Sequence, residues 1–288
     1  MSTQVRPAAS WDRGCPTACT RLSLDRGEQL SLPGPPVTGW VLLQLPGPWG
    51  PQAAGDSPAV PEALRAAARD RGLRLGLIRR HGQRPSGPRL RAFLASPNGP
   101  EPILEQLPLD DALRLPPRAL DAVAAGAPSG LGTIIDRPIF LACTHGRRDA
   151  CCARLGRPVA QALAAVAADR TWESTHIGGC RFAANVVSLP SGVYYGRLSP
   201  QDAAAVVAAS DTGRIAVPWY RGTAGLPAAA RSADAFLRRF TGLSGRDEIH
   251  MVGSRGLPGG LEEVEFATPR GRFVLRLRQH DVVSMTVR

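Results

Sequence analysis

The first half of the chain places short apolar runs on either side of longer amphipathic stretches. The runs Gly39–Leu45 and Leu73–Ile78 predict two strands, and the stretch between them, Pro61–Arg71, is rich in alanine, leucine and arginine and predicts a helix. A third strand is expected at Arg89–Ala95 and a closing helix at Pro117–Ala125. This order of elements predicts a mixed α/β fold.

The second half repeats that order of elements, although only as a pattern. The expected elements are a strand at 138–142, a helix at 150–168, strands at 171–175, 183–189 and 192–197, and a helix at 200–209. Pro158 should kink the first of these helices or make it restart after Gly156, because proline lacks an N–H group and clashes with the preceding turn.

The last part of the chain, after Gly213, predicts a small unit of one helix and an antiparallel sheet. The helix is expected at Ala228–Phe240 and the strands at 248–253, 262–267, 272–278 and 282–287. In the third of these strands Phe273, Leu275 and Leu277 alternate with arginines, so the arginine face should lie in solvent or against a partner. We therefore divide the chain into an irregular leader at 1–36, a first domain at 37–130, a second domain at 131–212 and a C-terminal α+β extension at 213–288.

The segment 137–185 holds the most distinctive chemistry, with four of the six cysteines and two of the five histidines. A short buried strand delivers Cys143 to its C-terminal end. Asp149 can cap the helix that follows, and the first turn of that helix carries Cys151 and Cys152. Free backbone N–H groups and the helix dipole would stabilise a thiolate there, so this loop is a candidate for metal binding or thiol chemistry.

A second loop, after the next predicted strand, offers His176 and Cys180 on a glycine-rich turn. With Cys143 and one of Cys151 or Cys152, they make three thiolates and one imidazole, a set that suits zinc or an iron–sulfur cluster. Structural zinc sites usually have about two to four residues between paired ligands. Eight residues separate Cys143 from Cys152, and this wide loop favours a [2Fe-2S] cluster, whose two irons are held from opposite sides.

Three motifs resemble the sucrase/ferredoxin-like family, a branch of the thioredoxin-like ferredoxins. Residues 143–152, CTHGRRDACC, are similar to the family's C-x-H-G-x-R-D-x-C-C, and residues 176–185, HIGGCRFAAN, to its H-x-G-G-H-x-F-A-x-N. Residues 190–197 are similar to the P-x-G-x-x-Y-G-R that follows. The resemblance implies two thioredoxin-like units in tandem, of which the second carries an iron–sulfur site and the first is a supporting or docking domain.

In this family two cysteines and two histidines hold a [2Fe-2S] cluster. By resemblance the cluster-binding residues here are Cys143, Cys152, His176 and Cys180. Position 180 departs from the family pattern, because it is cysteine where the family has histidine. Cys151 and His145 are possible substitutes. The residues alone do not separate Cys151 from Cys152, and His145 is equally well explained as a hydrogen-bonded loop histidine.

The predicted function is electron transfer between a reductase and an acceptor protein. The alternatives are a thiol–disulfide redox enzyme, with Cys143 or Cys152 as nucleophile, and a zinc-stabilised interaction domain. A dithiol mechanism gives His176 and Cys180 no role, and a zinc domain does not need the wide first loop. No motif places two carboxylates as acid and nucleophile, so sucrase activity gets no support and an electron carrier is favoured over an enzyme.

The charge of the chain is strongly basic, with a net charge of +11, and all 35 basic residues are arginine. The absence of lysine, together with many alanines, glycines and prolines, indicates a GC-rich genome. The arginines form no stripe interleaved with aromatic residues, so nucleic-acid binding is not expected. An acidic redox partner is the better explanation for this charge.

The sequence has no apolar run of the roughly 20 residues that a spanning helix needs, and its beginning lacks the apolar core of a signal peptide. We therefore expect a cytoplasmic protein with no membrane partner, in which thiols stay reduced. Cys15 and Cys19 form a C-x3-C pair in the leader and are expected to be free thiols, either mobile or packed.

Overall fold

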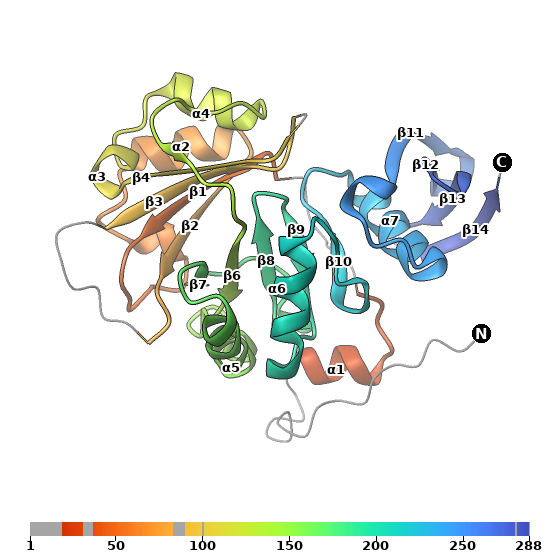
Figure 1. The fold of residues 1–288 in the computed structure, drawn as a ribbon, viewed down its shortest axis with the longest axis horizontal. Helices are drawn as coiled ribbons and strands as arrows, with labels where there is room; N and C mark the ends of the chain where they lie inside the picture. Colours follow the sequence, from red (N-terminus) through yellow and green to blue (C-terminus); the bar gives the residue numbers. More distant parts are fainter. Residues whose placement is uncertain (1–18, 31–36, 83–89, 100, 280, 288) are drawn as a thin grey trace.

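Strands from both halves of the chain join one large sheet (Figure 1). The computed structural model describes residues 19–30, 37–82, 90–99, 101–279 and 281–287, so Cys15 and most of the leader lie outside the described residues. The strands of this sheet are β1 (Gly39–Gln44), β2 (Leu73–Arg79), β3 (Arg91–Ser96), β4 (Ile103–Pro108), β5 (Thr133–Ile134), β6 (Ile139–Cys143), β7 (Thr171–Ser174), β8 (Val186–Leu189), β9 (Val193–Tyr195) and β10 (Tyr220–Thr223). Their order is β10-β9-β8-β6-β7-β2-β1-β3-β4-β5, and the mixed α/β fold is as predicted.

The two halves contribute strands with the same pairing pattern. β1 pairs in parallel with β2 and antiparallel with β3, which pairs with β4. β6 likewise pairs in parallel with β7 and antiparallel with β8, which pairs with β9. A helix connects each parallel pair, α2 (Glu62–Asp70) in the first half and α5 (Ala150–Val166) in the second, as a parallel crossover requires. The halves join where β2 pairs antiparallel with β7.

Helices cover one face of each half, and the other two faces pack against each other. The first half is covered by α2, α3 (Leu109–Ala112) and α4 (Pro117–Ala124), and the second by α5 and α6 (Ala203–Asp211). Because successive strand residues point to opposite faces, Val41 packs with the first-half helices, whereas Trp40 enters a core that also holds Leu141 and Trp172 of the second half. The two halves therefore share apolar core.

The C-terminal unit is a helix on a four-stranded antiparallel sheet. These elements are α7 (Ala228–Thr241), β11 (His250–Leu257), β12 (Leu261–Thr268), β13 (Gly271–Arg278) and β14 (Asp281–Val287). Leu237 of α7 packs on Val264 and Leu275 of the sheet. On the opposite face of β13, Arg276 is exposed and forms an ion pair with Glu263 at 2.9 Å. Of the two predicted positions for the arginine face, in solvent or against a partner, Arg276 has the first.

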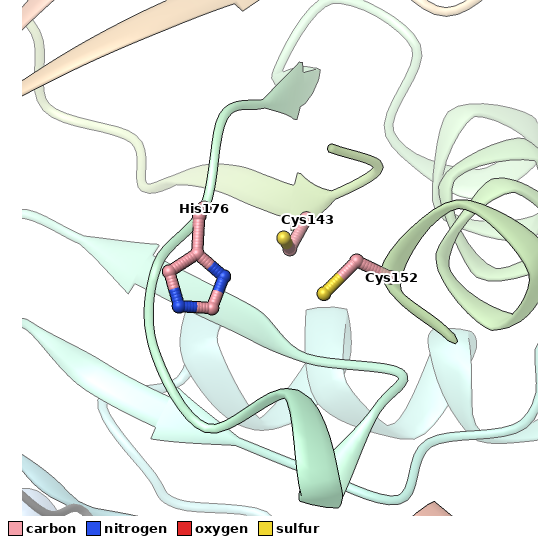
Figure 2. A group of neighbouring side chains, drawn as sticks. All are labelled: Cys143, Cys152 and His176. Atoms are coloured by element: carbon pink, nitrogen blue, oxygen red, sulfur yellow. The ribbon is translucent and has the colours of Figure 1, made fainter. Parts of the chain in front are cut away.

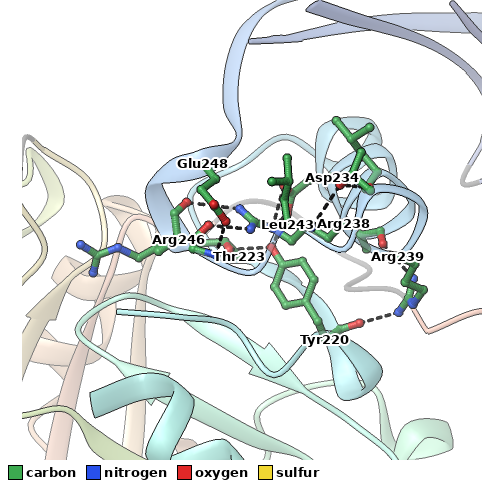
Figure 3. Close-up of polar contacts among 12 residues, drawn as sticks. Tyr220, Thr223, Asp234, Arg238, Arg239, Leu243, Arg246 and Glu248 are labelled. Carbon is green, nitrogen blue, oxygen red and sulfur yellow. Dashed lines mark hydrogen bonds and ion pairs between the residues drawn. The ribbon is translucent and has the colours of Figure 1, made fainter. Parts of the chain in front are cut away.

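A buried polar network attaches α7 to the last strand of the large sheet (Figure 3). The Tyr220 hydroxyl of β10 donates to Asp234 Oδ2 at 2.5 Å, and Arg238 Nε donates to Asp234 Oδ1 at 3.1 Å. Arg239 donates to the Tyr220 carbonyl at 2.6 Å. Burial raises the pKa of Asp234, and the positive charge of Arg238 acts against that rise. The network fixes where the C-terminal unit begins.

Several elements differ from the sequence-based expectations. The leader, expected to be irregular, contains the short helix α1 (Cys19–Asp25). Pro158 was expected either to kink its helix or to make it restart after Gly156; α5 is continuous through Pro158, so the restart is wrong. Pro158 lies on the exposed side of α5, where water can satisfy the carbonyl group of Arg154 that loses its partner. Strands β4, β5 and β10 and the short helix α3 were not predicted.

Among the described residues, none of the helices combines the length and the apolar character needed to cross a bilayer.

Candidate metal centre

The first loop of the candidate site joins the end of β6 to the start of α5. Asp149 caps α5, because its Oδ1 accepts a hydrogen bond from the Cys151 N–H at 2.8 Å. Gly156 lets the helix press against the strand, since a Cβ atom at that position would lie 1.9 Å from the Cys143 carbonyl oxygen. This close approach places Cys152, in the first turn of α5, beside Cys143 at the end of β6.

His176 comes to the same place from the neighbouring strand. β6 and β7 run in parallel, so the residues that follow them emerge at the same edge of the sheet. The sulfurs of Cys143 and Cys152 and a ring nitrogen of His176 all lie within 4.8 Å of one another. Figure 2 shows these three side chains converging from a strand end, a helix and a loop.

Cys180 completes the group from the turn after His176. Its sulfur lies 3.5 Å from His176 Nδ1 and within 4.8 Å of the Cys152 sulfur. The turn needs Gly179, whose φ is 73° and whose position leaves no room for a Cβ atom, because Arg221 Nη2 would lie 2.1 Å from it. The four predicted ligands are therefore brought together by two loops.

Hydrogen bonds among these side chains shift their pKa values in opposite directions. The Cys152 side chain stabilises the thiolates of Cys143 and Cys180, so the pKa of Cys143 is well below its ordinary value and that of Cys180 falls to about 6. The same bonds hold the Cys152 proton and raise the pKa of Cys152. Bonds to Cys143 and Cys180 raise the pKa of His176 to about 9. Binding a metal through all four residues must therefore release the protons of Cys152 and His176.

The two substitute ligands have other contacts. His145 is buried, its Nε2 donates to the Gly50 carbonyl at 2.8 Å, and its Nδ1 accepts from the His176 N–H at 3.3 Å. Both ring nitrogens are thus engaged, and His145 fixes the loop that carries His176. Cys151 lies beside Cys19, with their sulfurs 3.7 Å apart. Neither residue belongs to the group around Cys143.

A sequence model of the sucrase/ferredoxin-like family matches residues 76–222, a little more than half of the chain. The chain belongs to the sucrase/ferredoxin-like family. No curated protein matches it. Among solved structures, a thioredoxin-like [2Fe-2S] ferredoxin from Aquifex aeolicus is similar to it, with 21% sequence identity, a TM-score of 0.29, and coverage of 33% of this chain and 97% of the ferredoxin.

This sucrase/ferredoxin-like protein supports the Cys180 turn with a buried arginine. Arg221 Nη1 donates to Asn185 Oδ1 at 2.6 Å, and Asn185 Nδ2 donates to the Gly179 carbonyl at 2.9 Å. Burial lowers the pKa of Arg221 to about 9, so the side chain remains a cation at neutral pH. Arg221 thus fixes the turn between His176 and Cys180 through Asn185.

Helix α1 covers the same turn and was missed by sequence reasoning. Thr20 Oγ1 donates to the Cys180 carbonyl at 3.1 Å, and Arg197 Nη2 donates to Ser23 Oγ at 2.9 Å. Glu28, just after α1, forms an ion pair with Arg181. The pair Cys15 and Cys19 was the only signal in this segment, and nothing in the local pattern connects it with residues more than a hundred positions away.

Proposed function

We propose that this protein transfers electrons through one [2Fe-2S] cluster held by Cys143, Cys152, His176 and Cys180. The observation that carries the proposal is the convergence of three sulfurs and one imidazole from two opposed loops at one edge of the sheet. This donor set fits an iron–sulfur cluster, whose ligands are thiolates and, in some centres, histidines. When bound, such a cluster accepts and returns a single electron.

The protein residues around the site would hold and tune the cluster. The backbone N–H groups of His145 and Ile177 help to lower the pKa of Cys143 and so stabilise the negative charge of its thiolate. Hydrogen bonds to ligand sulfurs and nearby positive charge both favour the reduced form, so Arg221 would favour electron uptake. Cys143 and Cys152 are buried, whereas His176 and Cys180 are half-buried, so the His176–Cys180 side is the exit for the electron.

The burial of the first pair also argues against a thiol–disulfide enzyme. A nucleophilic thiolate must reach its substrate, but Cys143 is 1% exposed and Cys152 is 1% exposed. Cys180 is more accessible, and its contacts with His176 place it in the ligand group.

The proposal includes an acidic redox partner and a cytoplasmic, reducing environment. Exposed arginines surround the first loop and the start of α5, at Arg147, Arg148, Arg154 and Arg157. Such a surface favours a partner with negative charge, and electron exchange with it should weaken as salt is added. The described cysteines are all free thiols, which is compatible with the cytoplasm.

Anaerobic purification followed by metal, sulfide and absorption measurements tests the cluster. The purified protein should be red-brown and contain two irons and two acid-labile sulfides per chain, which is the composition of one [2Fe-2S] cluster. Cys143→Ala and Cys152→Ala should lose colour, iron and sulfide, whereas Cys151→Ala should keep them. A colourless protein whose zinc is lost in Cys143→Ala would contradict the proposal. If Cys151→Ala loses the colour and Cys152→Ala keeps it, then Cys151 is the ligand in place of Cys152.

A further inference from the structure

A second group of ligand-type side chains lies next to the proposed cluster site. The sulfur of Cys19, at the start of α1, is 3.7 Å from the sulfur of Cys151 and 3.4 Å from Asp149 Oδ2. The three ligand atoms all lie within 4.8 Å of one another. Cys151 is buried, and Cys19 and Asp149 are half-buried. The proposed electron-transfer site gives Cys19 and Cys151 no role.

The spacing of these atoms fits a tetrahedral metal ion. Metal–sulfur bonds of about 2.3 Å at a tetrahedral zinc place two sulfurs about 3.8 Å apart, and a sulfur and a carboxylate oxygen about 3.5 Å apart. The observed distances are 3.7 Å and 3.4 Å. Little movement of the side chains is therefore needed for one ion to contact all three.

The Asp149 carboxylate favours a metal site over a disulfide between Cys19 and Cys151. A Cys19–Cys151 disulfide would remove the S–H group that donates to Asp149 Oδ2 and leave a negative group beside it. A divalent cation would instead neutralise the two thiolates and the carboxylate together. Asp149 is also oriented for the purpose, because its Oδ1 is fixed by the helix cap and its Oδ2 faces Cys19.

We propose that Cys19, Asp149 and Cys151 bind one divalent cation of borderline softness, for which zinc is the best chemical match. Two thiolates and one carboxylate leave a fourth tetrahedral position for water. The ion would link α1 to the start of α5 and hold α1 over the turn that carries Cys180. None of these three residues is a proposed cluster ligand, but Asp149 lies between the two groups, because its carboxylate also lies within 4.8 Å of the Cys152 and Cys180 sulfurs. The proposal therefore goes beyond the proposed function, and the two metals have to be counted separately.

Zinc and iron can be counted separately in the full-length protein. The protein is purified anaerobically, dialysed against zinc and then against zinc-free buffer, and analysed for both metals. Wild type should retain one zinc per chain at this site. Cys19→Ser and Cys151→Ser should each reduce it to none, with iron unchanged, and Cys143→Ser should show the converse, losing iron and keeping zinc. Because Cys19 is half-buried and is the first residue of a short helix, its variant tests the site even if Cys151→Ser does not fold.

Two results would overturn the site. Zinc that persists in both Cys19→Ser and Cys151→Ser is held elsewhere. A disulfide between Cys19 and Cys151 in the anaerobically purified protein would mean that the pair is a redox couple. Ser23→Ala, the control, removes a contact of α1 with Arg197 and none of the ligands, so it should keep zinc.

Discussion

At the scale of single residues, the pKa of a cysteine in or beside the candidate centre depends on whether it accepts or donates hydrogen bonds. Cys19 and Cys180 are both half-buried, yet their pKa values move apart. Cys180 accepts from Cys152 and His176, which lowers its pKa to about 6. Burial, together with its contacts to Cys151 and Asp149, raises the pKa of Cys19 to about 12. Exposure alone would not distinguish these two thiols.

Alkylation of metal-free protein, prepared with a chelator under reducing conditions, should show this difference. Cys180 should react with iodoacetamide at neutral pH, with a rate that falls as pH drops through about 6, because protonation removes the nucleophilic thiolate. Cys19 should stay unmodified over the same range and serves as the internal control. Mass spectrometry of the peptides measures both. Equal rates for Cys180 and Cys19 at pH 7 would contradict the proposed hydrogen bonds, as would an unchanged Cys180 midpoint in His176→Ala.

At the scale of elements, the position of the first turn of α5 depends on how closely that helix packs on β6. Alanine in place of glycine usually stabilises a helix, by up to about 1 kcal/mol. At Gly156 the added Cβ would lie 1.9 Å from the Cys143 carbonyl oxygen, and that oxygen is backbone that cannot turn away. Overpacking of this kind costs about 1–3 kcal/mol, so the sign of the substitution should reverse.

Gly156→Ala should therefore lower the free energy of unfolding by about 1–3 kcal/mol, measured by urea denaturation. Moving α5 away from β6 should also separate Cys152 from Cys143 and weaken metal binding. Gln161→Ala, at an exposed position of the same helix, should change stability by no more than about 0.5 kcal/mol. A Gly156→Ala protein as stable as wild type would show that the contact with Cys143 is looser than described.

The elements themselves were largely predictable, since the periodicity that defines a helix or a strand is local. The choice between Cys151 and Cys152 was not predictable from the residues alone, and only the family resemblance favoured Cys152. Consecutive residues on a helix point about 100° apart, so which of them faces Cys143 depends on how α5 is rotated on the sheet. That rotation depends on Gly156, which approaches the end of β6, and on Leu155 and Val159, which pack in the core beneath α5. The cysteine spacing does not determine it. The contact of Cys151 with Cys19 was beyond sequence reasoning for the same reason.

At the scale of the whole molecule, the two halves are joined by more than a connecting segment. The short pairing of β2 with β7, the shared core around Trp40 and Trp172, and the bond from His145 to Gly50 all cross between them. The sequence predicted two units of similar pattern, but it could not show that one unit completes the surroundings of the site in the other. Such contacts depend on which strand edges meet, and the apolar pattern of each strand leaves that open.

Glu173 lies at the centre of this junction. Its Oε2 accepts from Arg79 Nη2 at 2.7 Å and from Thr144 Oγ1 at 2.8 Å, and its Oε1 contacts His81 Nδ1 at 2.7 Å. Burial alone would raise its pKa, but the bonds from Arg79 and Thr144 outweigh this and the pKa lies below its usual value. The carboxylate thus connects the end of β2 in the first half with the residue next to Cys143.

Glu173→Gln should lower the free energy of unfolding by about 1–3 kcal/mol at pH 7, because the amide keeps the shape but loses the charge-assisted bonds. An acid whose pKa is lowered on folding stabilises the protein above its unfolded pKa and loses that contribution as pH falls through the folded pKa. The difference between wild type and variant should therefore be full above about pH 4.5 and shrink below it. Glu62→Gln, which removes an exposed ion pair with Arg65, should cost no more than about 0.5 kcal/mol at any pH. Denaturation curves across pH measure both, and a Glu173→Gln cost that is independent of pH would mean that the carboxylate charge does not hold the halves together.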